Sequence, residues 1–349
     1  MNVSEIIFFT AFILFIVLML AFDLGVLNRE NKLISLKKAL IFTGVWVGFA
    51  LIFYGLLYFR AEWIHGISTY EHLQLLNLKH GHHLTLTGNF ETDLLLYRKA
   101  MSLEYITGFL IEKTLSVDNI FVIILIFGSF NVDPKYYHKI LFYGVLGAIV
   151  MRFVFIFLSA ALIHKFSWFL AVFGLILLIT GIKMFFTRHQ KENIDPNRHF
   201  MVRFLSRYFA VSPVYDNGNF FTKINGKRLI TPLLVVLLVV EFSDVIFAVD
   251  SIPAIFAITQ DPYIVFFSNI FAILGLRSIF FVLSSMVERF RYLKTGLSVL
   301  LVFIGVKMLL STLLHIEISA QISLLGIFLI LGVSILWSFV KGRGNCQSE

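Results

Sequence analysis

The sequence has 349 residues, of which 58% are hydrophobic and only 14% are charged, and its mean hydropathy is +0.88. This composition excludes an ordinary soluble domain and predicts an all-α membrane protein with several spans. The net charge of +8 does not call for a nucleic-acid partner, because an uneven distribution of lysine and arginine between the loops accounts for most of it. The single cysteine, Cys346, excludes a disulfide framework.

Nine apolar segments each come close to the ~20 residues that a helix needs to cross a bilayer. The first has no positive charge before it and no small-residue cleavage site after it, so we interpret it as a retained span and not as a signal peptide. The nine predicted transmembrane helices cover 6–27, 38–59, 101–127, 139–163, 167–187, 231–258, 263–287, 296–314 and 318–340.

The distribution of lysine and arginine predicts the orientation of the chain. If nine spans alternate across the membrane, 19 of the 29 basic residues lie on the side of the C-terminal tail and 5 lie on the opposite side. Basic residues accumulate in the cytoplasmic loops of membrane proteins. We therefore expect the N-terminus outside and the C-terminus in the cytoplasm, with the lipid bilayer as the first partner of the protein.

The predicted outer loop between the second and third spans is rich in histidine. A cluster such as His80-Gly-His82-His83 is able to bind a transition metal weakly, but histidines in exposed loops are more often only solvated. We favour the second interpretation and assign the loop no function from its sequence. The histidines concerned are His65, His72, His80, His82 and His83.

Two predicted spans carry carboxylates at the same spacing. The third span has Glu112 and Asp118, six residues apart, and the sixth has Asp244 and Asp250 at the same separation, with Glu241 one helical turn earlier. Each acid inside a membrane costs roughly 2.5–3.5 kcal/mol on insertion scales. Five such acids, arranged in a repeated pattern, indicate an ion site.

Other charged residues recur in the same order in spans 3–5 and spans 6–8. Gly181-Ile-Lys183-Met returns as Gly305-Val-Lys307-Met, and Arg152 corresponds to Arg277, with offsets of 124 and 125 residues against 132 for the acidic motif. Chance similarity between apolar segments is the alternative, but it does not explain the order of the charges. Spans 3–5 and 6–8 therefore read as two three-helix repeats. An odd number of crossings in each makes them inverted repeats, as in many secondary transporters.

The acids of the sixth span do not share one helical face, because six residues rotate a helix by roughly 240° between Asp244 and Asp250. Pro253 can interrupt or redirect the helix at this point, because it has no N–H and its ring clashes with the carbonyl of Val249. We expect a break or kink at Asp250 that frees a backbone oxygen for a cation.

The cytoplasmic loop contains two predicted elements. Residues 200–209 place Phe200, Phe204 and Tyr208 on one helical face, which is typical of an amphipathic helix at the membrane surface. The segment that follows reads as a short β-hairpin around an Asn225-Gly226 turn.

The predicted spans offer oxygen ligands and contain no histidine or cysteine, which favours a hard divalent cation or protons over a soft metal. We expect no resident cofactor. The competing hypothesis is that the acids only neutralise buried bases; we favour an ion site that Arg152 and Arg277 support. The proposed metal ligands are Glu112, Asp118, Glu241, Asp244 and Asp250, supported by Asn119, Ser251, Pro253, Arg152 and Arg277.

Two motifs make the chain similar to a known family. Glu112-Lys-Thr-Leu-Ser-Val-Asp-Asn119 and Glu241-Phe-Ser-Asp-Val-Ile-Phe-Ala-Val-Asp-Ser-Ile-Pro-Ala254 closely resemble the signatures of the TerC/Alx family of bacterial inner-membrane proteins. Arg277 and the two Gly-(Ile/Val)-Lys-Met segments are also similar, and the resemblance runs from about 6 to 340. It implies an inner-membrane location, a link to tellurite resistance and, for the Alx branch, manganese export through the five acids.

We therefore expect a secondary transporter that exports Mn²⁺ or a similar divalent cation, with proton coupling left open. The alternative is a membrane scaffold or assembly factor that gives tellurite or metal-stress resistance indirectly. An enzyme is not expected, because no nucleophile–base pair or phosphate loop is present; homo-oligomers and membrane-protein partners stay open. The predicted segments are 1–100 (two spans and the outer loop), 101–187 (first repeat), 188–230 (cytoplasmic loop), 231–314 (inverted second repeat) and 315–349 (last span and tail).

Overall fold

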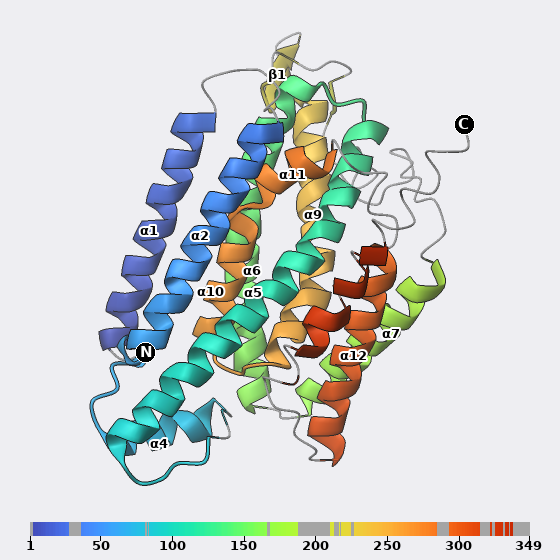
Figure 1. The fold of residues 1–349 in the computed structure, drawn as a ribbon. Coiled ribbons are helices and arrows are strands. Elements are labelled where there is room, and N and C mark those ends of the chain that lie inside the picture. The colour runs from blue at the N-terminus through green and yellow to red at the C-terminus, as the bar shows by residue number, and fades with distance from the viewer. Residues whose placement is uncertain are drawn as a thin grey trace.

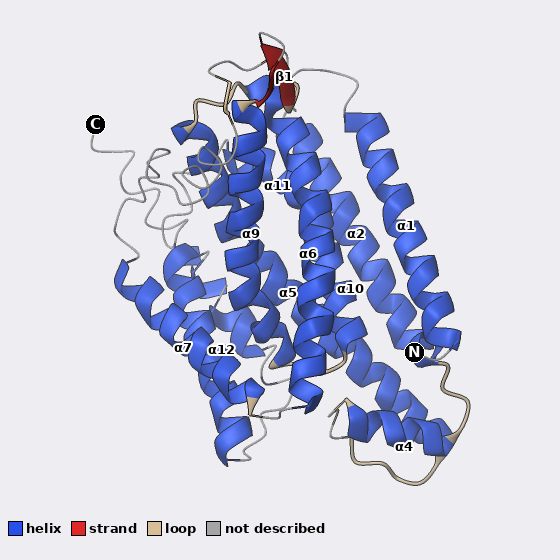
Figure 2. Ribbon diagram, turned by 180° about the vertical axis from the view of Figure 1, so that it is seen from behind, coloured by secondary structure: helices blue, strands red, loops and turns tan. Residues whose placement is uncertain are grey.

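The computed structural model shows a bundle of long helices with one small β-hairpin (Figure 1). The hairpin lies at one end of the bundle, and the short helix α4 lies at the opposite end, close to the N-terminus (Figures 1 and 2). The structure describes residues 3–27, 36–80, 82, 84–165, 168–187, 210–212, 216, 218–224, 227–284, 293–314, 322, 325–330, 332–334 and 336–337.

The described helices follow the predicted apolar segments closely. The helices in or overlapping these segments are α1 (Val3–Leu27), α2 (Leu36–Arg60), α5 (Phe90–Ser129), α6 (Tyr137–Lys165), α7 (Phe169–Thr187), α9 (Pro232–Phe256), α10 (Pro262–Leu274), α11 (Leu276–Ser284) and α12 (Leu293–Leu314). Short ones precede α5 and α6: α3 (Glu62–His65), α4 (Tyr70–Lys79) and the 3₁₀ turn η1 (Pro134–Tyr136).

Four described helices are long and apolar enough to cross a membrane. They are the first part of α1, the whole of α2 and α9, and most of α6 together with the turn η1. Helices α10 and α11 meet at Gly275 with a bend of 42° and make a fifth span if the pair is counted as one. The prediction of a multi-span helical membrane protein is thereby confirmed. The number nine stays a prediction, because the last predicted span, 318–340, is described only in short pieces.

Helix α5 is much longer than a membrane is thick. It starts where the side chain of Asn89 accepts hydrogen bonds from the backbone N–H groups of Glu91 and Thr92, which makes Asn89 its N-cap. Its 40 residues correspond to ~60 Å at 1.5 Å per residue, against ~30 Å of hydrocarbon. Much of the predicted outer loop is therefore helical. Arg98 on α5 also holds Glu62 of α3 through two hydrogen bonds of 2.7 and 2.5 Å.

The contacts between helices pair the two predicted repeats. Helix α5 packs on α9 and α10, α6 packs on α9 and α10, and α7 packs on α12. Suppose that α5 is exchanged with α9, α6 with the bent pair α10 and α11, and α7 with α12. The list of helix–helix contacts given above is then unchanged. The inverted relation of the two repeats stays a prediction.

Glycines bring α7 and α12 into close contact. A Cβ atom added at Gly305 would lie 2.7 Å from the backbone nitrogen of Leu178 and 2.9 Å from the carbonyl oxygen of Gly174. A Cβ at Gly181 would lie 2.9 Å from the carbonyl oxygen of Ser298. Small residues permit such an approach between transmembrane helices. Both halves of the repeated Gly-(Ile/Val)-Lys-Met segment therefore lie in one helix–helix contact.

Aromatic side chains fill the space between α1, α2 and α10. The ring centroids of Phe12 and Phe267 are 4.4 Å apart, and those of Phe53 and Phe271 are 5.0 Å apart. Aromatic rings at such separations add attraction beyond the area that they bury. This packing fixes α10, and with it the residues that precede α10, against the N-terminal helices.

The predicted break at Asp250 is wrong, whereas the alternative of a kink with a freed carbonyl oxygen stays a prediction. Helix α9 continues through Pro253 and ends at Phe256, so the proline stands in the last turn of the helix. A proline removes a single hydrogen bond there, and only three residues follow it in the helix. The backbone N–H of Ala257 already bonds to the carbonyl of Pro253 at 3.0 Å. The helix end, and not a mid-span break, is what Pro253 marks.

The predicted β-hairpin is confirmed. Strands β1 (Phe221–Ile224) and β2 (Lys227–Ile230) are antiparallel, and Ile224 pairs with Lys227, which is the register of a two-residue connection. The predicted amphipathic helix at 200–209 lies outside the described residues.

Candidate metal-ion site

A buried arginine joins the two acidic motifs. Arg152 on α6 is fully buried, and its Nη1 donates to Oε1 of Glu112 on α5 and to Oδ1 of Asn269 on α10. Its Nη2 donates to Oδ1 of Asp244 on α9 at 3.2 Å. Asn269 Nδ2 in turn donates to Glu112 Oε2 at 3.3 Å. Four helices thus place two of the predicted ligands on one cation.

The network leaves oxygen atoms that no described group satisfies. One guanidinium between two carboxylates balances only one of their two charges. Among the described residues, Asp244 Oδ2 in this network is buried and has no hydrogen-bond partner, and the same is true of Arg152 Nε; Ser251 Oγ, seven residues further along α9, also has none. Buried oxygens of this kind are costly unless a donor or a cation satisfies them. The arrangement can therefore accept additional positive charge beside Asp244.

Glu241 lies against a glycine of the neighbouring helix. Its carboxylate occupies the space that a Cβ atom of Gly147 on α6 would fill. Glu241 precedes Asp244 by three residues, so both project from one face of α9 toward α6. Glycine at position 147 is therefore what allows the carboxylate of Glu241 to reach this place.

We expect Gly147→Ala to displace the Glu241 carboxylate and to reduce any ion transport through this site severalfold, with little change in the amount of inserted protein. Gly144→Ala is the matched control on the same helix, because its Cβ would make only an ordinary contact of 3.7 Å with Val240. Ion flux through reconstituted vesicles compares the two variants. Equal flux in both would exclude a role for the position of Glu241.

The other predicted site residues are placed less completely. Asp118 lies in α5 and Asp250 in α9, but their side chains are outside the described part of the structure. Asn119 is buried on α5. Arg277 is buried on α11, where its guanidinium carbon lies 5.7 Å from the ring centroid of Phe142 on α6.

The neighbouring lysines have separate partners. Lys113 donates from Nζ to the carbonyl oxygen of Ala272 at 2.9 Å, near the C-terminal end of α10, where a positive charge is favourable. Lys183 is exposed, as expected for a lysine that reaches the membrane surface, whereas Lys307 is buried near Glu104.

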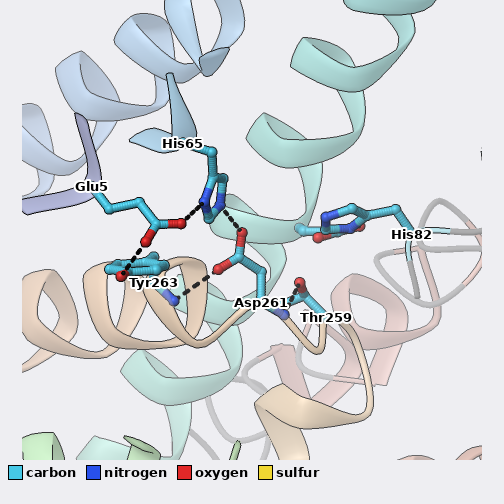
Figure 3. A network of polar contacts seen from close by, with 7 residues as sticks. Glu5, His65, His82, Thr259, Asp261 and Tyr263 are labelled. Atoms are coloured by element: carbon cyan, nitrogen blue, oxygen red, sulfur yellow. Dashed lines mark hydrogen bonds and ion pairs between the residues drawn. The ribbon is translucent and has the colours of Figure 1, made fainter. Parts of the chain in front are cut away.

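A second polar cluster surrounds His65 at the end of the bundle that carries α4. His65 is fully buried; its Nδ1 lies 2.9 Å from Glu5 Oε1, and its Nε2 lies 2.8 Å from Asp261 Oδ2. Tyr263 donates its hydroxyl hydrogen to Glu5 Oε2 at 3.3 Å. Figure 3 shows the imidazole between the two carboxylates, with His82 on the other side of Asp261.

Two further histidines belong to this cluster. The ring of His80 stacks on His65 with centroids 5.3 Å apart, and His82 Nδ1 lies 3.2 Å from Glu104 Oε1. The side chains of His65, His80 and His82 are all buried, so the expectation that these histidines are solvated is wrong. Aromatic rings lie against two of them: the ring centroid of Tyr263 is 5.3 Å from that of His65, and the ring centroid of Tyr97 on α5 is 5.7 Å from that of His82. His72 is half-buried on α4, and the placement of His83 is not described.

The surroundings of these histidines separate their protonation states. Burial lowers the pKa of His65, but the charge of Asp261 and the hydrogen bonds to Asp261 and Glu5 outweigh it and raise that pKa to about 9. Burial lowers the pKa of His80 to about 4. Although burial opposes it, the charge of His65 holds the pKa of Asp261 well below its usual range. At neutral pH, His65 is therefore charged between two carboxylates and His80 is a neutral imidazole.

The chain matches the sequence profile of the integral membrane protein TerC family over residues 97–345. It belongs to the TerC family. This confirms the resemblance carried by the two acidic motifs, and it makes the chain a multi-pass integral membrane protein.

Three relatives illustrate the similarity of this TerC-family chain. It is 41% identical over 338 residues to an uncharacterised membrane protein of Myxococcus xanthus, covering 97% of this chain and 93% of that protein. It is 39% identical over 339 residues (97% and 95%) to a protein of Escherichia coli K12 named putative membrane-bound redox modulator Alx. A protein of the same name in Salmonella typhi is 51% identical over 235 residues (67% and 72%). No solved structure matches the chain.

Proposed function

We propose that this TerC-family protein is a secondary transporter that exports a hard divalent cation, Mn²⁺ foremost, across the bacterial inner membrane. The observation that carries the proposal is the contact of Arg152 with both Glu112 and Asp244, which brings the acids of the two motif helices to one buried point. The proposed ligands are the five intramembrane carboxylates Glu112, Asp118, Glu241, Asp244 and Asp250.

The chemistry of these groups supports a hard cation. The network contains carboxylate and amide oxygens, and such ligands suit Mn²⁺, Mg²⁺ or Ca²⁺ better than a soft metal. In the described state, the guanidinium of Arg152 bonds to both Glu112 and Asp244. An entering cation would compete with it for these two carboxylates, and protons that the acids exchange for the metal are the proposed coupling ions.

The proposed orientation follows from the basic residues of the loops. The hairpin and the C-terminal tail would lie in the cytoplasm, and the end with α4 and the histidine cluster would lie outside. Export would then carry the cation from the hairpin end of the bundle toward the α4 end.

The test is Mn²⁺ flux in vesicles reconstituted with purified protein under a proton gradient. We expect wild-type protein to move Mn²⁺ and Asp244→Asn to reduce the flux at least tenfold, since asparagine keeps an acceptor for Arg152 but loses the charge. Asp250→Asn should behave in the same way. Asp133→Asn is the matched control, because its carboxylate pairs with Lys135 at an exposed turn before α6. Equal flux through wild type and Asp244→Asn would refute the proposal.

A scaffold or assembly factor is the second candidate, and the same ion pairs favour it. If Glu112 and Asp244 serve only to neutralise Arg152, their role is to hold four helices together, and resistance to tellurite or metal stress arises indirectly. Wild-type protein would then move no Mn²⁺, and Asp244→Asn would lower the unfolding temperature. The redox role in the name of the Alx relatives would need a route other than an internal disulfide, because the sequence has one cysteine.

A further inference from the structure

We propose that His65, His80 and Asp261 form a binding site for a divalent transition metal of the Zn²⁺ type, separate from the intramembrane carboxylates. One ligand atom from each of these three residues lies within 4.8 Å of the other two. The three come from different parts of the chain: the end of α3, the residue after α4 and the residue before α10. All three are buried, so the fold itself brings them together.

The donor set differs in kind from that of the intramembrane site. Two imidazoles and one carboxylate are ligands for Zn²⁺, Co²⁺, Ni²⁺ or Fe²⁺, whereas a site with oxygens alone prefers harder ions. Glu5, Asp261 and Glu104 supply three carboxylates around the histidines. The cluster therefore has both the nitrogen ligands and the negative charge that a borderline divalent cation requires.

The hydrogen bonds of His65 already orient it as a metal ligand. A histidine that binds a metal through one ring nitrogen usually donates its other N–H to a carboxylate or carbonyl. Nδ1 of His65 lies 2.9 Å from Glu5 Oε1, and Tyr263 in turn holds Glu5. This leaves Nε2 directed at Asp261 Oδ2, 2.8 Å away.

A metal ion fits between these two atoms with a small adjustment. Ligands about 2.1 Å from a tetrahedral Zn²⁺ are about 3.4 Å from one another. Nε2 of His65 and Oδ2 of Asp261 would therefore separate by only about 0.6 Å, as the ion takes the place of the shared proton. The stacked ring of His80 stands beside them.

His82 would have to move to become a fourth donor, because its ring nitrogens lie outside the group of atoms within 4.8 Å of one another. It repeats the arrangement of His65, because its Nδ1 pairs with Glu104 while its Nε2 is buried and has no hydrogen-bond partner among the described residues. Its ring centroid lies 5.9 Å from that of His80. Four donors are the number that a closed zinc site uses.

The competing explanation is a purely structural ion triad, in which charged His65 links Glu5 and Asp261 and no metal binds. The triad needs neither His80 nor His82, so these two residues separate the explanations. A metal site loses affinity when His80 is removed, whereas the triad does not involve it.

The test is a titration of purified, chelator-treated full-length protein in detergent with Co²⁺, whose visible absorption reports tetrahedral nitrogen ligation, followed by competition with Zn²⁺. We expect one equivalent of Co²⁺ to give intense bands that Zn²⁺ abolishes. His80→Ala should weaken binding at least tenfold, and Glu5→Ala should weaken it roughly 10–100-fold through the loss of the hydrogen bond that orients His65. His72→Ala, which removes a histidine of α4 outside the cluster, should bind as wild type does.

Asp244→Asn serves to separate this site from the proposed transport site. It should keep the full Co²⁺ spectrum even where it abolishes Mn²⁺ flux, because the network around Arg152 shares no residue with the histidine cluster. Absence of the bands in wild type, or equal titrations of wild type and the folded His80→Ala protein, would overturn the proposal. If His80→Ala does not fold, His82→Asn and the wild-type spectrum decide the question in the same way.

Discussion

Arg152→Ala is expected to lower the free energy of unfolding by about 3–5 kcal/mol, because it leaves two buried carboxylates without their cation. Glu112 and Asp244 both accept hydrogen bonds from this guanidinium, and Asn269 loses its bond to Nη1 as well. Reversible unfolding in mixed detergent, followed by tryptophan fluorescence, measures the loss. An unfolding free energy within about 1 kcal/mol of wild type would contradict the described network.

Two further variants show whether the lost charge or the lost side-chain volume of Arg152 causes the loss of stability. Arg60→Ala is the matched arginine control: its side chain is 56% exposed and lies 3.7 Å from Glu62, so the expected change is below about 1 kcal/mol. Combining Arg152→Leu with Glu112→Gln and Asp244→Asn removes the cation together with both charges. We expect this triple variant to recover most of the lost stability, since no uncompensated charge stays buried.

Gly305→Ala is expected to destabilise the protein by about 1–3 kcal/mol by forcing α7 and α12 apart. The added Cβ would meet the backbone nitrogen of Leu178 at 2.7 Å, and backbone atoms cannot rotate away as a side chain can. The contact between α7 and α12 is the most extensive between any two described helices, so the whole pair must adjust. Thermal unfolding in detergent measures the effect.

The control for this variant lies on α2. A Cβ at Gly48 would meet nothing within 4 Å, and alanine is a better helix former than glycine by about 1 kcal/mol. Gly48→Ala should therefore leave the unfolding temperature unchanged or raise it. If both variants behave alike, the glycine contact between α7 and α12 does not contribute to stability.

The sequence predicted those features that local patterns record. Hydropathy located the helices, and the Asn225-Gly226 pair located the hairpin, because turn chemistry acts over a few residues. The repeated spacing of charges identified Glu112 and Asp244 as partners across the chain. The prediction failed at Pro253, because its position relative to the helix end, and not its presence alone, decides whether a helix breaks there.

The histidine cluster shows what a sequence pattern does not contain. His65 and Asp261 are separated by 196 positions, and Glu5 lies 60 positions before His65. No spacing rule joins three such residues, because only the packing of α1, α3 and α10 brings them together. The His80-Gly-His82 segment gave the one local signal, and the sequence did not show that Tyr97 and Glu104 of α5 would lie against His82.

Because α5 is continuous, the distance between the two polar centres along its axis is fixed. Glu104, in the histidine cluster, and Glu112, beside Arg152, lie on the same unbroken helix, eight residues or ~12 Å apart along its axis. An α-helix does not stretch, so this axial separation stays constant whatever the rest of the bundle does. Any rearrangement that opens a passage between the two centres must therefore move other helices relative to α5, because it cannot change the axial separation of Glu104 and Glu112.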